Sequence, residues 1–301
     1  MGSGLETTHH LVTALLNLAV AVLTGATLSR SWLSRERCPW ADVRRRRARD
    51  VAVAAAVVAL AADAAWLWLE SAAMAEVPVF DAGSATWTMA TSTHLGMAWC
   101  IGFAGLTVAA CAFGRDGWPT IAALAVFWYT RSMASHAASD GDFSVRLLAD
   151  CIHLGLTSLW VGAVIVSGGI ILRTAGETTS ADRRARASYV TSLSDAATIA
   201  LAGIVVTGLY ATWRNLRGIG DLIGNAYGNT LVAKLLLVAV AALLGGFNRL
   251  VVMPPWLADG ATRPALSSRF KRILWIEAAS LTGAVVAAAW LASTAPPGEH
   301  M

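Results

Sequence analysis

Long apolar runs separated by short polar tracts dominate the pattern of this chain. A helix needs about 20 predominantly apolar residues to cross the hydrocarbon core of a bilayer. Runs of that kind recur along the whole length and predict membrane-spanning helices at about residues 8–30, 50–72, 85–113, 118–137, 145–172, 187–213, 228–252 and 271–293. The pattern therefore predicts an all-α polytopic membrane protein with eight transmembrane helices.

Composition and charge agree with a membrane protein and indicate its orientation. Of the 301 residues, 56% are hydrophobic and 14% are charged, whereas a soluble domain carries roughly 25% charged residues. Most of the 23 lysines and arginines fall after the first, third, fifth and seventh predicted spans. An excess of basic residues marks the cytoplasmic side of a membrane. We therefore expect both termini on the external side, a lipid bilayer as surroundings, and no binding of nucleic acid.

The loops between spans are too short for a soluble domain. We expect a single membrane domain over residues 1–301, with a five-helix part at 1–185 that carries the histidine-bearing helices and a three-helix part at 186–297. The sequence contains no P-loop, no dinucleotide-binding fingerprint after a strand and no serine nucleophile elbow. These absences argue against an enzyme. The four cysteines form no CxxC pair, which argues against a disulfide framework or a zinc cluster.

All six histidines fall on or near the predicted external face. His94 lies in the outer half of the third predicted span, His136 at the outer end of the fourth and His153 in the outer third of the fifth. The others are terminal: His9, His10 and His300. Ionisable side chains within a membrane are candidates for function. Three imidazoles on separate helices at similar depth therefore predict a metal site, with helix packing as the competing interpretation for each residue.

Methionines accompany these histidines at helical spacing. Met97 follows His94 by three residues and Met133 precedes His136 by three, so each pair would share a face of one helix. Imidazole binds either oxidation state of copper, and thioether sulfur favours Cu⁺ over Cu²⁺. The candidate copper ligands are His94, His136, His153, Met97 and Met133. His9 and His10 are candidates for the first ligands that copper meets on arrival from outside.

Charged residues within the predicted spans form a second group of interest. Isolated charges at this depth are costly, so they should pair or face water. Asp63 or Asp150 would make an ion pair with Lys234, and the sequence does not choose between them. Asp150 also precedes His153 by three residues, which suits it to orient that imidazole. Structural ion pairs and an ion or proton path both remain open for these residues.

Several segments resemble the copper resistance D domain of the CopD family of bacterial inner-membrane proteins. The resemblance extends over about 186–297 and to shorter upstream motifs, whereas the first two predicted spans carry no motif that we can assign. The matching stretches are VVTGLYATWRNL (205–216), YGNTLVAKLLLVAVAALLGGFNRLVVMP (227–254), LASTAPP (291–297), THLG (93–96), SHAAS (135–139) and HLGLTSLWVGA (153–163). Two positions depart from the family pattern: Ser135 replaces a frequent glycine and Met97 replaces a frequent arginine.

The resemblance implies a multi-pass protein of the bacterial inner membrane that transports copper; in that membrane the external side, on which the charge pattern places both termini, is the periplasm. It also implies a periplasmic copper-binding partner of the CopC type. Carried over by motif, the ligands are His94, His136 and His153. Two alternatives stay open: a b-type cytochrome or quinone-linked redox protein in which the same histidines bind haem, and an assembly partner in which they only hold helices together.

Overall fold

The structure, a computed structural model, describes residues 3–112, 117–173, 179–215, 226–258 and 264–291. Within these ranges the chain forms helices and turns, with no strand. The α-helices are α1 (Ser3–Leu33), α2 (Pro39–Met74), α3 (Gly83–Ser92), α4 (His94–Cys111), α5 (Gly117–Met133), α6 (Val145–Val166), α7 (Ser180–Asn215), α8 (Ala226–Phe247), α9 (Met253–Ala258) and α10 (Pro264–Leu291). Short 3₁₀ helices, η1 (Val79–Asp81) and η2 (His136–Asp140), lie between them.

Seven helices in the described ranges are long and apolar enough to cross a membrane. The remaining candidate, α5, has 17 residues and packs against α1, α4 and α6. The predicted class, an all-helical membrane protein, is confirmed. The count of eight transmembrane helices and the external position of the termini stay predictions.

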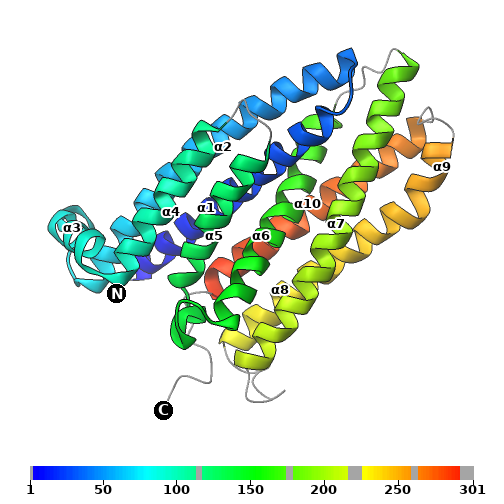
Figure 1. Cartoon of the computed structure of the whole chain (residues 1–301). Coiled ribbons are helices and arrows are strands. Elements are labelled where there is room, and N and C mark those ends of the chain that lie inside the picture. Colours follow the sequence, from blue (N-terminus) through cyan, green and yellow to red (C-terminus); the bar gives the residue numbers. More distant parts are fainter. Residues whose placement is uncertain (1–2, 113–116, 174–178, 216–225, 259–263, 292–301) are drawn as a thin grey trace.

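Helix α1 lies at the centre of the bundle, where it contacts α2, α5, α6, α7 and α10 (Figure 1). It approaches α6 backbone to backbone. A Cβ atom placed on Gly25 would lie 2.0 Å from the carbonyl carbon of Gly162, and one placed on Gly162 would lie 1.7 Å from the carbonyl oxygen of Ala21. Small residues at such crossings let membrane helices pack backbone to backbone. The glycines therefore set the distance between α1 and α6.

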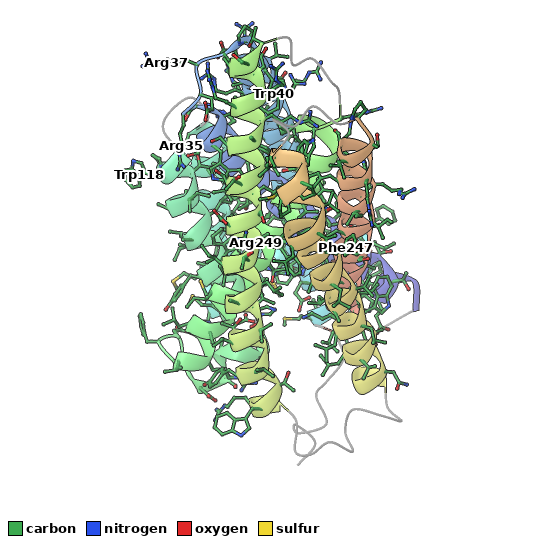
Figure 2. All side chains as sticks on the ribbon, turned by 90° about the vertical axis from the view of Figure 1, so that its right-hand side faces the viewer. Arg35, Arg37, Trp40, Trp118, Phe247 and Arg249 are labelled. Atoms are coloured by element: carbon green, nitrogen blue, oxygen red, sulfur yellow. The ribbon has the colours of Figure 1, made fainter. Side chains whose placement is uncertain are left out.

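The two ends of the bundle differ in chemistry. Helix α1 begins and α10 ends at one end, together with η2 (Figure 1); we call this the histidine end because His9, His94, His136 and His153 lie there or within a few turns of it. The connection between α1 and α2 lies at the other end, which we call the arginine end. Figure 2 shows Arg35 and Arg37 there. The separation matches the predicted segregation of basic residues.

The third predicted span contains a break. The prediction of one helix over 85–113 is wrong, because α3 ends at Ser92 and α4 begins at His94. Thr93 between them is extended, and its hydroxyl oxygen accepts a hydrogen bond from the Gly96 amide at 3.0 Å. A side chain that accepts from the amide three residues ahead is an N-cap, which starts a new helix. His94 therefore occupies the first turn of α4.

Two helices contain π-turns, in which the hydrogen bonds skip one residue more than in an α-helix. One, η3 (Ser167–Ile171), extends α6, and the other, η5 (Asn248–Val252), joins α8 to α9. Buried side chains bind both turns. The Arg44 Nε–H donates to the Ile171 carbonyl at 3.0 Å, and the Asn248 amide donates to the Phe270 carbonyl at 3.3 Å. Contacts from neighbouring helices thus hold both turns in place.

Candidate functional site

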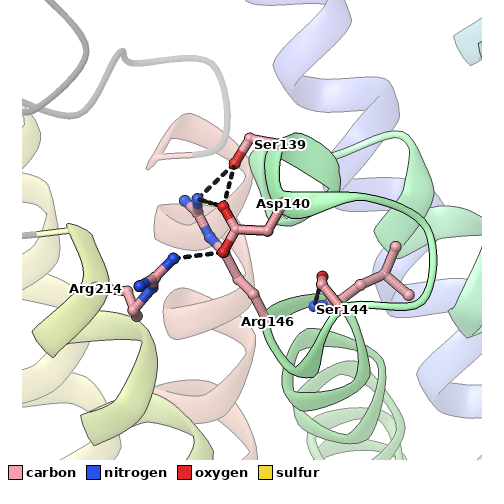
Figure 3. A network of polar contacts seen from close by, with 6 residues as sticks. Ser139, Asp140, Ser144, Arg146 and Arg214 are labelled. Carbon is pink, nitrogen blue, oxygen red and sulfur yellow. Dashed lines mark hydrogen bonds and ion pairs between the residues drawn. The ribbon is translucent and has the colours of Figure 1, made fainter.

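The segment between α5 and α6, residues 134–144, joins several helices at the histidine end; we call it the connector. A carboxylate at its centre, Asp140, forms ion pairs with Arg214 of α7 and, at 3.7 Å, with Arg146 of α6 (Figure 3). Arg146 also donates to the Ser139 hydroxyl at 2.6 Å. The next helix begins where Ser144 caps it by accepting from the Leu147 amide at 3.1 Å. The connector is therefore fixed to both α6 and α7.

A second carboxylate of the connector binds the first candidate histidine. The Nε2 atom of His94 lies 2.8 Å from Asp142 Oδ2. The Tyr129 hydroxyl of α5 donates to the Asp142 carbonyl at 2.5 Å, which fixes the backbone there. A carboxylate accepts hydrogen bonds and donates none when ionised, so the proton in this contact sits on Nε2. That tautomer leaves the lone pair of His94 on Nδ1.

His153 is held through its other ring nitrogen, Nδ1. Its Nδ1 atom lies 2.9 Å from the Thr207 hydroxyl of α7, and that hydroxyl donates its own hydrogen to the Gly203 carbonyl at 2.7 Å. Because the hydroxyl hydrogen is used, Thr207 accepts from His153 Nδ1–H. The lone pair of His153 is then on Nε2. The next residue of α7 also lies beside the ring: a Cβ atom on Gly208 would lie 3.7 Å from Cε1, which is an ordinary contact distance.

The other predicted ligands lie near the same end of the bundle. The backbone of His136 begins η2 within the connector, and its side chain lies outside the described residues. Helix α5 ends at Met133, so Met133 and His136 do not share a face of one helix as predicted. Met97 lies one turn after His94 on α4 and is 61% exposed. Met89 is buried on α3 and accepts a hydrogen bond from the Ser71 hydroxyl.

The histidines of α1 lie between helices. The His9 Nε2 atom is 2.9 Å from Glu70 Oε2 of α2, and the His9 ring is 5.8 Å from Trp66. His10 is 5% exposed, with its ring 5.0 Å from that of Trp290 on α10. Their role as first ligands for arriving copper stays a prediction. His300 lies outside the described residues.

Charged side chains form a network below the connector. Asp150 interacts electrostatically with Lys234, and Lys234 in turn with His153. Of the two predicted partners for Lys234, the structure thus favours Asp150. Asp150 also accepts from the Ser135 hydroxyl of the connector at 3.2 Å, directly beside His136.

Asp63 has a different cation beside it. Asp63 is 2% exposed and lines a small cavity together with Arg131 of α5. The Arg131 guanidinium lies 4.1 Å from the centre of the Trp66 ring, a cation–π contact. Arg131, which is partly buried, therefore lies among the charged side chains of this region, and the sequence did not assign it a partner.

The geometry does not show one joined cluster. Over the described residues, no three His, Cys, Asp or Glu side chains are grouped so as to hold a metal ion. That set includes neither thioether sulfur nor His136. His94 contacts the connector, whereas His153 faces α7, and α5 packs between α4 and α6. Convergence of the three histidines on one ion stays a prediction.

The partners of the histidines were not found from the sequence. Asp142 is 48 residues from His94, and Thr207 is 54 residues from His153. No local spacing rule connects residues so far apart. The one available signal was the polar SDGDFS stretch before α6, which marks a turn that brings carboxylates to a helix start.

Thr93→Ala tests the cap that places His94. Loss of an N-cap hydroxyl typically lowers the free energy of unfolding by about 1 kcal/mol. The matched control is Thr91→Ala, because that exposed hydroxyl bonds to the Trp87 carbonyl of its own helix and to the neighbouring exposed Ser92 hydroxyl, and caps no helix; its effect should stay within about 0.5 kcal/mol. Thermal unfolding in one detergent compares the two. Equal losses of stability would contradict the cap.

Comparisons with known proteins place the chain in a family. Residues 187–291 match the family described as copper resistance protein D, and residues 5–145 match the N-terminal domain of copper resistance protein D-like proteins. The second match includes the first two predicted spans, for which the sequence motifs gave no assignment. Copper resistance protein D of Pseudomonas syringae pv. tomato is 28% identical over 265 residues, which cover 82% of this chain and 80% of the relative.

No solved structure matches the chain. The two family matches follow one another along the sequence in the order of the described helices: the first covers α1 to α5, the second α7 to α10, and α6 lies between them. The resemblance inferred from the motifs is thereby confirmed. The chain belongs to the copper resistance protein D family, and it is a copper-related membrane protein.

Proposed function

We propose that the protein binds copper ions at its histidine end and transports copper across the bacterial cytoplasmic membrane. The observation that carries the proposal is the way in which two imidazoles are held. His94 donates its Nε2–H to Asp142, and His153 donates its Nδ1–H to Thr207. Histidines that bind metals typically donate one ring N–H to an oxygen and present the other nitrogen to the ion. Both residues follow this pattern.

The donor atoms near these imidazoles fit copper. Met97 is one helical turn from His94 and exposes its thioether, and Met133 ends the helix that leads into the connector. Imidazole with thioether suits copper in either state, whereas calcium or magnesium would require a cage of oxygen ligands. His136 completes the proposed set because the connector that carries it is bonded to His94 through Asp142 and to α6 through Ser135.

The burial of the two histidines supports a sequence of binding. The His94 side chain is 58% exposed, whereas His153 lies two turns inside α6 and contacts α7. Copper delivered from outside therefore meets His94 and Met97 first and His153 afterwards. A periplasmic copper-binding protein of the CopC type is the proposed donor. Transfer between neighbouring sites keeps the ion ligated while it leaves water.

The thiol nearest the arginine end does not offer a strong second site. Cys38 lies between α1 and α2 and is 6% exposed. Burial raises the pKa of this thiol. Copper binds the thiolate, so a raised pKa disfavours binding at neutral pH. The proposal accordingly rests on the histidine end.

Metal analysis of purified protein tests copper binding. We expect about one copper ion per chain after loading and removal of excess metal, and little in the His94→Ala/His136→Ala/His153→Ala variant. The control is Cys111→Ala, because Cys111 is an exposed thiol at the end of α4 that would bind copper nonspecifically. Equal copper in the parent and the triple variant would contradict the proposed ligands.

An absorption spectrum of the same samples tests the haem alternative. A Soret band in the parent that disappears in the triple variant would show that these histidines bind haem and not copper. Transport itself is measured separately, as copper uptake into vesicles that contain the parent or the triple variant. If the parent binds copper but the vesicles take up none, copper binding would stand and copper transport would be contradicted.

A further inference from the structure

A glutamate lies in the middle of α10. Glu277 is 14 residues from the last residue of α10 and 13 from its first, which places it about 20 Å from each end of the helix. Its side chain is among the buried ones, with the residue 3% exposed. The residues around it on the same helix are apolar and buried, among them Ile273, Ala278 and Leu281. The carboxyl group is thus surrounded by hydrocarbon.

One polar partner fixes the carboxyl group. The indole N–H of Trp160 on α6 donates to Glu277 Oε1 at 3.0 Å. Helix α8 also approaches the carboxyl group closely, because a Cβ atom on Gly245 would lie 3.0 Å from the same oxygen and 3.5 Å from Oε2. Trp160 is itself 3% exposed. The three helices α6, α8 and α10 therefore enclose a carboxyl group with a single donor directed at it.

The charged groups on the elements packed against α10 are directed elsewhere. On η5, Arg249 donates to Asp195 at 2.9 Å and to Ser194 at 2.7 Å. On α8, Lys234 interacts with Asp150 of α6. Both π-turn η3 and helix α9 lack titratable residues. Arg269 of α10 itself lies over the Phe247 ring.

The remaining titratable groups lie toward the two ends. On α6, Arg146, Cys151 and His153 belong to the histidine end, as do Glu6, His9 and His10 on α1. Near the arginine end are Arg30 of α1 and Lys271 and Arg272 of α10. No ion pair joins Glu277 to a cation of the described residues. An ionised carboxylate without a counter-ion is strongly disfavoured in such surroundings, and binding a proton removes the charge.

We propose that Glu277 is a proton-binding site at the centre of the membrane bundle, oriented by the Trp160 N–H. The neutral acid keeps Oε1 as acceptor for the indole and carries the proton on Oε2. Release of that proton leaves a carboxylate that the Trp160 donor stabilises. A group that gains and loses one proton at mid-depth is the element that coupling to a proton gradient requires. The site stands apart from the copper ligands, since no hydrogen bond or ion pair joins Glu277 to those of them whose side chains the structure describes.

Infrared spectroscopy of the whole protein in lipid nanodiscs tests the site directly. A protonated carboxyl group in an apolar environment gives its own carbonyl band, separate from those of carboxylates and amides. We expect this band in the parent, its loss as the buffer is made alkaline, and its absence from Glu277→Gln at every pH. Glu6→Gln is the control, because Glu6 is largely exposed near the start of α1 and should leave the band unchanged.

A second variant keeps the test valid if Glu277→Gln does not fold. Trp160→Phe retains the acid and removes the donor, so the band should remain and move to higher frequency as the carbonyl loses its hydrogen bond. A parent spectrum without the band at any pH would overturn the proposal, as would a band that persists in Glu277→Gln. Both readouts are taken without copper. Absence of the carboxyl band would therefore not contradict copper binding, and absence of bound copper would not contradict the protonation of Glu277.

Discussion

Gly162→Ala is expected to lower the free energy of unfolding by about 3 kcal/mol or more and to separate α1 from α6. The added methyl carbon would lie 1.7 Å from the Ala21 carbonyl oxygen and 2.9 Å from the Gly25 amide nitrogen. These are backbone atoms of a buried helix, so they cannot rotate away as a side chain would. Overfilling a packed interior commonly costs roughly 1–3 kcal/mol, and backbone overlap belongs at the upper end.

The control for this prediction is a glycine with free space. A Cβ atom on Gly246, also within a helix, would meet nothing within 4 Å. Gly246→Ala should therefore be neutral or stabilise the helix by up to about 1 kcal/mol, the difference in helix propensity. Thermal unfolding and gel filtration in the same detergent compare the variants. Equal stability of Gly162→Ala and the parent would show that α1 and α6 are further apart than described.

Thr207→Val is expected to weaken copper binding by about 10- to 100-fold, the range found when the partner of a metal-binding histidine is removed. Valine keeps the shape of threonine and removes the oxygen that accepts from His153 Nδ1–H. The imidazole then loses the contact that fixes its tautomer and its orientation. Asp142→Asn, which replaces the ionised acceptor of His94, should act in the same direction at the other imidazole.

The matched control is Thr198→Val, on the same helix. Its hydroxyl bonds only to the Ser194 carbonyl one turn earlier, and it is exposed. Copper affinity is measured by competition with a chelator of known affinity. An unchanged affinity in folded Thr207→Val would remove His153 from the ligand set and would leave His94 and the connector to be tested alone.

The membrane-spanning class could be predicted because span length is a property of a continuous stretch of sequence. The same criterion failed at residues 85–113, since the THLG stretch stays apolar enough to hide the cap at Thr93. Hydropathy over a window of residues does not detect that the backbone of the single residue Thr93 is extended. The placement of His94 in a first turn, rather than inside a span, follows from that single residue.

The histidines were identifiable as candidates, whereas their surroundings were not. An imidazole in an apolar run is visible in the sequence, but its oxygen partner is supplied by a helix or connector about 50 residues away. The surroundings of Arg131, a partly buried cation, were not predicted either, because its aromatic partner Trp66 is on another helix. Pairing across helices depends on their rotation about their axes, which neither length nor composition determines.

The π-turns at 167–171 and 248–252 have a consequence for how the chain tolerates changes in length. A π-turn accommodates one residue more than the α-helix on either side of it. Removing one residue within such a turn restores regular helix and leaves the direction of the neighbouring side chains nearly unchanged. The same deletion elsewhere in a span would rotate every later side chain by about 100° about the helix axis. Deletion of a single residue should therefore be tolerated in these two turns and nowhere near the glycine crossing of α1 and α6.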